Sequence, residues 1–209
     1  PKDRQGEPLV VIKDFDGMMA LVQSAVLEIH PWGSTTKSWE KPDLITMDLD
    51  PGEDVSWPQV VEAALDLKSR LEAVGLAAFV KTSGGKGLHV VTPLKPKASW
   101  AKVKSFAKKL ATDMGKAEPD KYLAVATKAK RNGRIFIDYL RNGRGSTAVA
   151  PYSTRARAGA AVSMPIEWSE LSEISGPAEF TIKNTPKRLK DIKADPWARF
   201  FASAKPLPS

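Results

Sequence analysis

The stretch LITMDLDPG (residues 44–52) constrains the fold most, because it places two carboxylates inside an apolar run. Successive side chains of a strand point to opposite faces, so Asp48 and Asp50 project from one face and the apolar residues between them take the core face. Two adjacent buried carboxylates repel each other unless a cation neutralises them. The stretch therefore predicts a strand with a cation-binding acidic face. The alternative is a strand that ends at Met47, with both aspartates capping the turn at Pro51 and Gly52.

A third acid, Asp138, stands alone among apolar and aromatic residues in RIFIDYL, where a charge has no structural reason to lie. Three such acids on neighbouring strands would form the carboxylate set of a two-metal phosphoryl-transfer site. Ligation by oxygen alone favours Mg²⁺ or Mn²⁺ over Zn²⁺. The alternative for Asp138 is a structural aspartate that is hydrogen-bonded to a neighbouring turn.

The segment SGGKGLH (residues 83–89) combines glycines with three kinds of hydrogen-bond donor. Its spacing fits neither the P-loop nor the dinucleotide-binding glycine pattern. Exposed backbone N–H groups of the glycines can form an anion nest, to which Ser83, Lys86 and His89 add donors. The segment therefore predicts a cradle for a triphosphate, with a plain glycine turn as the alternative.

Two arginines and a histidine complete the candidate site residues. Arg155 and Arg157 in STRARAG have strand spacing, which places both guanidiniums on one face among small residues. Guanidiniums in that arrangement suit phosphate oxygens, with solvated surface charges as the alternative. His30 in IHPWGS, taken alone, is interpreted as a core histidine, with contact to a sugar hydroxyl as the alternative.

Composition limits the classes of protein that fit. With 209 residues, 42% of them hydrophobic, the chain can bury the core of one domain. The net charge of +8 favours a polyanionic partner such as nucleic acid or nucleotide. The absence of cysteine excludes disulfides, thiolate metal sites and a cysteine nucleophile. With no apolar run of about 18 residues and no signal-peptide pattern, we expect a soluble intracellular protein. A start at Pro1 rather than Met suggests a piece of a longer polypeptide.

Hydrophobic periodicity and turn residues predict both helices and strands. A capping box at Ser56 and Gln59 starts one helix, and Gly75 ends it. Its Val61, Ala64, Leu65 and Leu71 are interpreted as core. The other predicted helices are 16–28, 99–114, a short one near 119–130, and small ones after Thr185. The predicted strands are 44–49, a hairpin centred on 84–87, RIFIDYL, and one that follows a loop within TRARAGAAVSMPI (residues 154–166).

Five motifs, taken together and in order, strongly resemble the polymerase domain of bacterial DNA ligase D, a member of the archaeo-eukaryotic primase superfamily. They are IHPWGS, MDLDPG, TSGGKGLHVV, AKRNGRIFIDYLRNGRGSTAVAPYSTRARAGA and VSMPIEW, which run from about Ile29 to Trp168. The resemblance implies an α+β fold with a mixed or antiparallel sheet related to the RNA-recognition motif, flanked by helices. It implies a single primase-polymerase-like domain over residues 1–209, from which an N-terminal portion is missing ahead of Pro1.

The resemblance also implies a role for each candidate residue. Asp48, Asp50 and Asp138 would bind two Mn²⁺ or Mg²⁺ ions. The phosphates would be held by Ser83, Lys86, His89 and Arg155, with Arg157 and His30 as further candidates. Basic side chains would follow the DNA backbone, namely Lys128, Lys130, Arg131 and Arg134.

The implied activity is the addition of nucleotides, preferably ribonucleotides, to DNA 3′ ends and gaps during non-homologous end joining. The implied partners are nucleoside triphosphates, DNA ends, the Ku protein and attached ligase and phosphoesterase domains, in the bacterial cytoplasm or nucleoid and without a membrane. Two alternatives use the same residues. One is a DNA- or nucleotide-binding module without turnover, and the other is a metal-dependent nuclease that directs the carboxylates at water.

Overall fold

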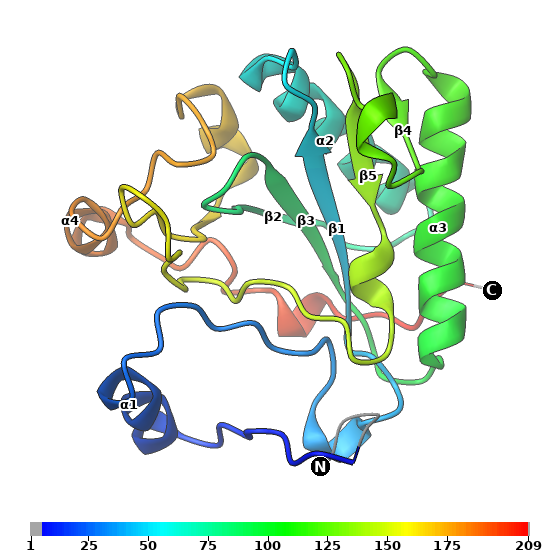
Figure 1. Cartoon of the computed structure of the whole chain (residues 1–209). Coiled ribbons are helices and arrows are strands. Elements are labelled where there is room, and N and C mark those ends of the chain that lie inside the picture. Colours follow the sequence, from blue (N-terminus) through cyan, green and yellow to red (C-terminus); the bar gives the residue numbers. More distant parts are fainter. Residues whose placement is uncertain (1–5, 209) are drawn as a thin grey trace.

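A mixed six-stranded sheet forms the centre of the fold, as the computed structural model of residues 6–208 shows (Figure 1). The side chain of Lys128 also lies outside the part that the structure describes. The strand order is β4-β5-β1-β3-β2-β6, and all neighbours are antiparallel except β4 and β5. The strands are β1 Leu44–Pro51, β2 Phe79–Thr82, β3 Leu88–Pro93, β4 Tyr122–Leu123, β5 Ile135–Asp138 and β6 Pro165–Ile166. The predicted α+β class with a mixed sheet is confirmed.

The first strand has the two unlike faces that its sequence predicts. Ile45, Met47 and Leu49 are completely buried in the core, while Asp48 and Asp50 lie on the opposite face. Because β1 continues through both aspartates to Pro51, the alternative in which the strand ends before them is wrong.

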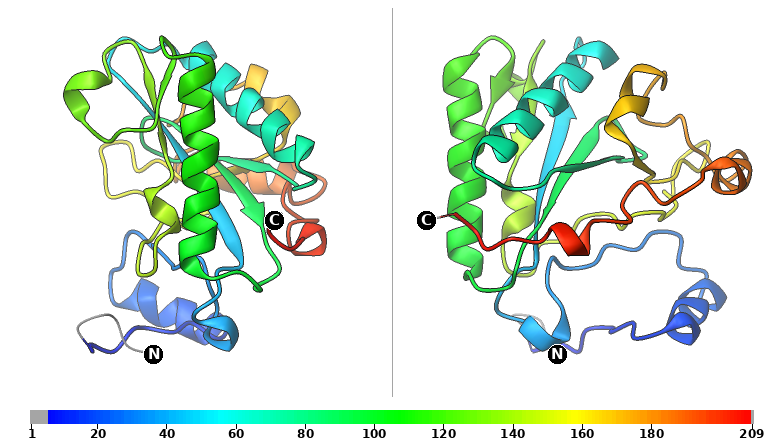
Figure 2. Two further views of the ribbon diagram at one scale, coloured as in Figure 1. Left: turned by 90° about the vertical axis from the view of Figure 1, so that its right-hand side faces the viewer. Right: turned by 180° about the vertical axis from the view of Figure 1, so that it is seen from behind.

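Two long helices cover the apolar face of the sheet. They are α2 Trp57–Ala73 and α3 Trp100–Ala117, and their buried side chains join those of β1 in one core cluster. Seen from behind in Figure 2, α2 lies across the strands and α3 runs along the β4–β5 side. The helices leave the acidic face of the sheet to the connecting segments.

Helix α2 begins with the predicted capping box, in which the Gln59 side chain accepts a hydrogen bond from Ser56 N at 2.8 Å. Of its predicted core residues, Leu65 is wrong because it is 45% exposed, whereas the partly buried Val61 packs against the core. The stripe that faces the sheet consists of Val60, Ala63, Ala64, Leu67 and Leu71. Leu65 lies one position beyond this stripe, on the flank of the helix.

The short helix predicted near 119–130 is wrong. This segment instead forms β4, which pairs in parallel with β5, followed by a 3₁₀ turn at Lys128–Lys130. Tyr122 and Leu123 are buried at the sheet edge, so pairing with β5 overrides the local helical pattern.

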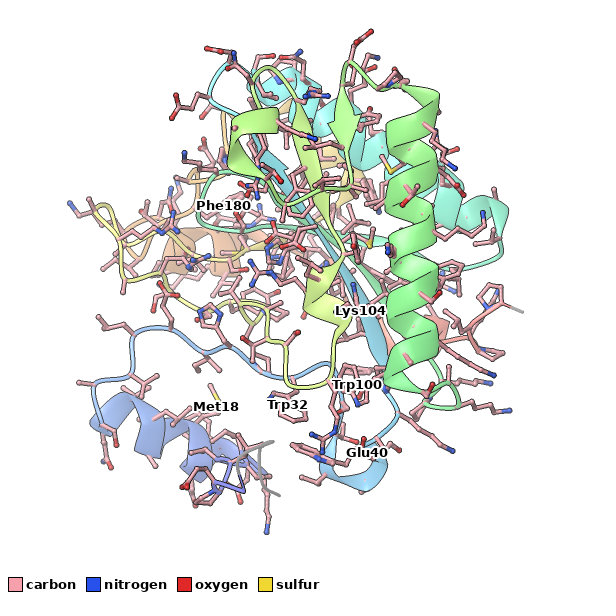
Figure 3. The ribbon with its side chains drawn as sticks, turned by 45° about the vertical axis from the view of Figure 1, so that its right-hand side comes forward. Met18, Trp32, Glu40, Trp100, Lys104 and Phe180 are labelled. Atoms are coloured by element: carbon pink, nitrogen blue, oxygen red, sulfur yellow. The ribbon has the colours of Figure 1, made fainter. Side chains whose placement is uncertain are left out.

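The N-terminal helix is shorter than predicted. Helix α1 covers Phe15–Gln23, and Ala25 adopts a left-handed conformation with φ 56°, which ends the helix. None of its residues is buried, and Figure 3 shows α1, which carries Met18, set apart from the sheet. At the other end of the chain, α4 Thr185–Asp191 and a 3₁₀ turn at Phe201–Ser203 confirm the predicted small helices.

Trp32 anchors the segment that carries His30. Its indole stacks on that of Trp39, with 4.2 Å between ring centroids, and meets Trp100 edge-on at the start of α3 (Figure 3). Trp32 also forms an isolated β-bridge with Thr147. The segment before β1 and the segment after β5 are therefore held together beside the acidic face.

The predicted hairpin is formed by β2 and β3, and its loop lies against the end of β1. A Cβ atom on Gly87 would be 1.8 Å from the carbonyl oxygen of Leu49. Only a residue without a side chain therefore allows the loop to approach the strand that carries the aspartates.

We expect Gly87→Ala to lower the free energy of unfolding by about 1 to 3 kcal/mol, because the new methyl group must push the loop away from backbone atoms. Urea denaturation measures the loss. Gly176→Ala is the matched control, since a Cβ there meets no atom within 4 Å. Equal stability of the two variants would contradict the close approach.

Candidate active site

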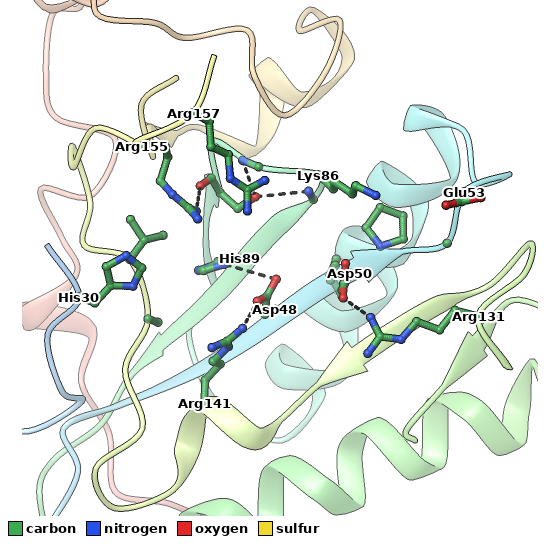
Figure 4. Close-up of a pocket in the computed structure, with 18 of the residues that line it drawn as sticks. His30, Asp48, Asp50, Glu53, Lys86, His89, Arg131, Arg141, Arg155 and Arg157 are labelled. Carbon is green, nitrogen blue, oxygen red and sulfur yellow. Dashed lines mark hydrogen bonds and ion pairs between the residues drawn. The ribbon is translucent and has the colours of Figure 1, made fainter. Parts of the chain in front are cut away.

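One pocket of about 810 Å³ opens on the acidic face where β1 ends (Figure 4). It gathers eight of the nine predicted site residues: His30, Asp48, Asp50, Ser83, Lys86, His89, Arg155 and Arg157. The ninth, Asp138, is buried beside Asp48 on the adjacent strand and does not line the pocket. The pocket also takes in Arg131 and Arg141, which the sequence analysis did not predict as site residues.

Four ionisable side chains form a row across the sheet below this pocket. Strand register pairs Lys81 with His89, His89 with Asp48, and Asp48 with Asp138. Directly paired residues of antiparallel strands share a face, so all four point to the same side. Nε2 of His89 lies 3.3 Å from Oδ1 of Asp48. The buried Lys81 Nζ donates to Ser163 Oγ at 2.6 Å.

Lys81 was missed by the sequence analysis. The signal was present, because a lysine in the otherwise apolar strand FVKT is as unexpected as the aspartates of β1.

Burial and nearby charge change the pKa values of three groups in the row. Burial lowers the pKa of Lys81 to about 7, while the negative charge of Asp48 opposes the change. Burial also lowers the pKa of His89, and the positive charge of Lys81 acts in the same direction. Burial alone would raise the pKa of Asp48, but contact with His89 and the charge of Arg141 hold it at about 2. At neutral pH, Asp48 is therefore a carboxylate and His89 is neutral.

Two arginines, one on each side of β5 in the sequence, neutralise the three carboxylates. The guanidinium of Arg141 lies 3.4 Å from a carboxylate oxygen of Asp48 and 3.4 Å from one of Asp138. Arg131 pairs with Asp50, and its guanidinium stacks over the ring of Phe136 at 4.6 Å. Sequence analysis assigned Arg131 to the DNA-facing surface, whereas the structure places it against a carboxylate of the pocket.

The side chain of Asn142 fixes the turn that carries Arg141. It accepts from the backbone N of Thr46 and donates to the carbonyl of Thr46, both at 2.8 Å, so it continues the β1 ladder where β5 ends. Asp138 also holds this turn, because its Oδ1 accepts from Leu140 N at 2.7 Å. Burial raises the pKa of Asp138. The structural role proposed as an alternative for Asp138 is thus present.

Asp48, Asp50 and Asp138 are chemically suited to a divalent cation, because their carboxylate oxygens lie on one face of two adjacent strands. Among the described residues, however, no three His, Asp or Glu side chains are close enough together to hold a metal ion. Arg131 and Arg141 supply the positive charge instead. A metal would therefore have to compete with these guanidiniums for the carboxylates.

The glycine loop is more internally bonded than predicted. Ser83 Oγ accepts from the backbone N of Gly85 at 3.1 Å and of Gly87 at 3.3 Å, so these two N–H groups are already bonded. The side chain of Lys86 is exposed at the pocket mouth. The loop therefore offers the pocket the ammonium group of Lys86 rather than an open nest of those two N–H groups.

The interpretation of His30 as a core histidine is wrong, because 37% of its side chain is exposed and it lines the pocket. Its Nε2 lies 2.7 Å from a carboxylate oxygen of Glu28, a residue that sequence analysis also missed. Arg155 is fixed nearby, since its Nη1 donates to Ser83 O at 2.7 Å.

A family profile described as "LigD, primase-polymerase domain" matches residues 1–197. The chain therefore belongs to this family. LigD of Pseudomonas aeruginosa, a multifunctional non-homologous end joining protein, is 38% identical over 194 residues, which are 92% of this chain and 23% of that protein. The bifunctional LigD of Bacillus subtilis is 30% identical over 200 residues, 95% of this chain and 32% of that protein.

The fold of the LigD polymerase family is confirmed by a solved structure. The polymerase domain of Mycobacterium tuberculosis ligase D in complex with DNA matches with a TM-score of 0.82 and 32% identity, covering 93% of this chain and 70% of that one. This chain spans less than a third of the two curated LigD proteins named above. Within residues 6–208, no helix is both long and apolar enough to cross a membrane.

The buried lysine leads to a prediction for stability against pH. Between a folded-state pKa of about 7 and the ordinary value of 10.5, the unfolded chain holds one more proton on Lys81, so stability rises with pH. We expect urea denaturation to show a gain of at most about 1.4 kcal/mol per pH unit from roughly pH 7.5 to 9.5. Lys81→Met should remove this gain, and Lys109→Met, at an exposed lysine, should keep it. The same slope in Lys81→Met and the unmodified chain would refute the assignment.

Proposed function

We propose that this chain is a metal-dependent nucleotidyltransferase that adds nucleotides to DNA 3′ ends and gaps in non-homologous end joining. The observation that carries the proposal is one pocket in which carboxylates lie opposite a lysine and arginines suited to phosphate. Membership of the LigD primase-polymerase family supports it, as do the end-joining names of the relatives and the DNA in the matched structure.

Asp48, Asp50 and Asp138 are the residues that would hold two Mg²⁺ or Mn²⁺ ions. Bound there, such ions would lower the pKa of a primer 3′-hydroxyl and offset the charge of the triphosphate. In the reaction, the 3′-oxygen forms a bond to the α-phosphorus, the bond from that phosphorus to the bridging oxygen breaks, and pyrophosphate leaves. The hydroxyl proton passes to solvent. Asp48 supplies negative charge that persists at neutral pH, because its pKa is about 2.

The opposite wall of the pocket would bind the triphosphate. Arg155 and Arg157 approach the glycine loop from one side, and Lys86 extends from the loop itself (Figure 4). These positive charges would stabilise the negative charge that develops on the leaving pyrophosphate. Ser83 shapes the loop, and the neutral His89 holds Asp48 in place. His30, at the rim, is positioned for a phosphate or a sugar hydroxyl.

DNA would approach over the segment that follows β4. Lys130 and Arg134 are at least partly exposed there, and Arg134 is fixed by a hydrogen bond to the carbonyl of Lys130. The side chain of Lys128, predicted for the same surface, lies outside the described residues. Contact with phosphates makes binding sensitive to salt. The proposed partners are Ku and attached ligase and phosphoesterase domains, in the bacterial cytoplasm. The proposed preferred substrates are ribonucleotides.

The alternatives are less well supported. A nuclease needs carboxylates and metal but has no use for a positively charged wall aimed at a triphosphate. A binding module without turnover gives no reason to gather three carboxylates on one face, which is costly because like charges repel.

The deciding experiment is extension of a labelled DNA 3′ overhang or gap by ribonucleoside and deoxyribonucleoside triphosphates, with Mn²⁺ or Mg²⁺. We expect incorporation by the unmodified chain and a loss of about a hundredfold or more in Asp48→Asn/Asp50→Asn, because removal of the ligand charges removes metal binding. Asp113→Asn is the matched control, since this aspartate pairs with Lys109 on the surface of α3.

Each other result favours a different function. Shortening of the labelled strand would identify a nuclease. DNA binding without change in strand length, equally in the unmodified chain and in Asp138→Asn, would identify a binding module.

A further inference from the structure

The carboxylate of Glu28 joins three groups at the rim of the pocket. Its Oε2 lies 2.7 Å from Nε2 of His30. Its Oε1 accepts from the backbone N of Ala156 at 2.7 Å and lies 3.2 Å from Nε of Arg155. One side chain therefore contacts both the histidine and the inner arginine proposed for nucleotide binding.

Glu28 is ionised at neutral pH. The hydrogen bond with His30, the one from Ala156 N and the positive charge of Arg155 outweigh partial burial and hold its pKa at about 2. Arg155 is the more buried partner, with 13% of its side chain exposed. Its Nη1 donates a hydrogen bond to Ser83 O, and its Nε forms an ion pair with Oε1 of Glu28 at 3.2 Å, so the guanidinium has a partner on each of two sides.

Hydrogen bonds that do not involve the Glu28 side chain hold the segment around Ile29 against the segment 150–153. Ile29 N donates to Ser153 Oγ at 2.9 Å, and Ala150 N donates to Ile29 O at 2.8 Å. Loss of the carboxylate is therefore expected to free the two side chains while leaving the segments in place.

We propose that Glu28 is a positioning residue that orients Arg155 and His30 to hold the triphosphate of the incoming nucleotide, an inference that rests on the proposed function. Electrostatics alone gives the opposite expectation, because a carboxylate beside a phosphate site repels the ligand and its removal strengthens binding. Orientation and repulsion thus predict changes of opposite sign in triphosphate affinity.

The test is calorimetric titration of the whole chain with a nucleoside triphosphate, with the corresponding nucleoside as a second probe. We expect Glu28→Gln to weaken triphosphate binding roughly tenfold, as for loss of a charge-assisted contact, and to leave nucleoside binding nearly unchanged. Glu170→Gln is the matched control, since this carboxylate pairs with Arg188 outside the pocket. A folded Glu28→Gln that binds the triphosphate equally well or more tightly would overturn the proposal.

A second variant keeps the test decisive if Glu28→Gln does not fold. Glu28→Asp retains the charge but shortens the side chain, so it cannot reach all three partners, and a weaker triphosphate affinity is again expected. Unchanged affinity in Glu28→Asp would count against orientation. If the unmodified chain binds triphosphate, the Glu28 variants bind it more weakly, and no DNA is extended, the result would contradict only the proposed function. No triphosphate binding by the unmodified chain would contradict both.

Discussion

The row of Lys81, His89, Asp48 and Asp138 is the interaction on which both the sheet and the pocket depend. Each member lies directly opposite the next on neighbouring strands, so cationic, neutral and anionic groups meet only in this register. A slip of one residue in β1 would turn both aspartates into the apolar core and Met47 and Leu49 out of it. The apolar face therefore specifies the register, and the register in turn assembles the charged face. Buried carboxylates are tolerated because lysine and arginine charges compensate them within the same fold.

The residues predicted correctly are those whose signal is local. Alternation within one strand was enough to place Asp48 and Asp50 on one face, and the glycines were enough to place the hairpin. Arg131 escaped prediction because its partner Asp50 is distant in sequence, as are Ala156 and Arg155 from Glu28. Arg141 has one partner nearby, Asp138, but its contact with Asp48 on β1 is also distant. Arg131 and Asp50 are 81 positions apart, and Glu28 and Ala156 are 128 apart. The short helix near 119–130 failed for the same reason, since only the distant strand β5 gives Tyr122 and Leu123 an edge to pair with.

The glycine loop shows a different limit of sequence reasoning. A sequence shows which donors a segment contains, but it does not show which of them the fold has already used. In the structure, the hydroxyl of Ser83 takes two of the glycine N–H groups and its carbonyl takes Arg155. The hydrogen bonds of Ser83 therefore hold the conformation of the loop. This explains why a glycine-rich segment without a P-loop spacing can still bring Lys86 and Arg155 to one pocket, with Arg155 held by the loop itself.

The same charges imply that metal and nucleotide, under the proposed function, bind cooperatively. Arg131 and Arg141 pair with the carboxylates that a divalent cation would need. A cation bound to those carboxylates would free the guanidiniums to attract an anionic ligand. A triphosphate that attracted the guanidiniums would leave the carboxylates uncompensated, which would favour the cation. Coupling of two binding equilibria is reciprocal, so each ligand must raise the affinity for the other by the same factor. The pairing of arginines with carboxylates thus keeps the buried acids neutralised and also links the two halves of the site.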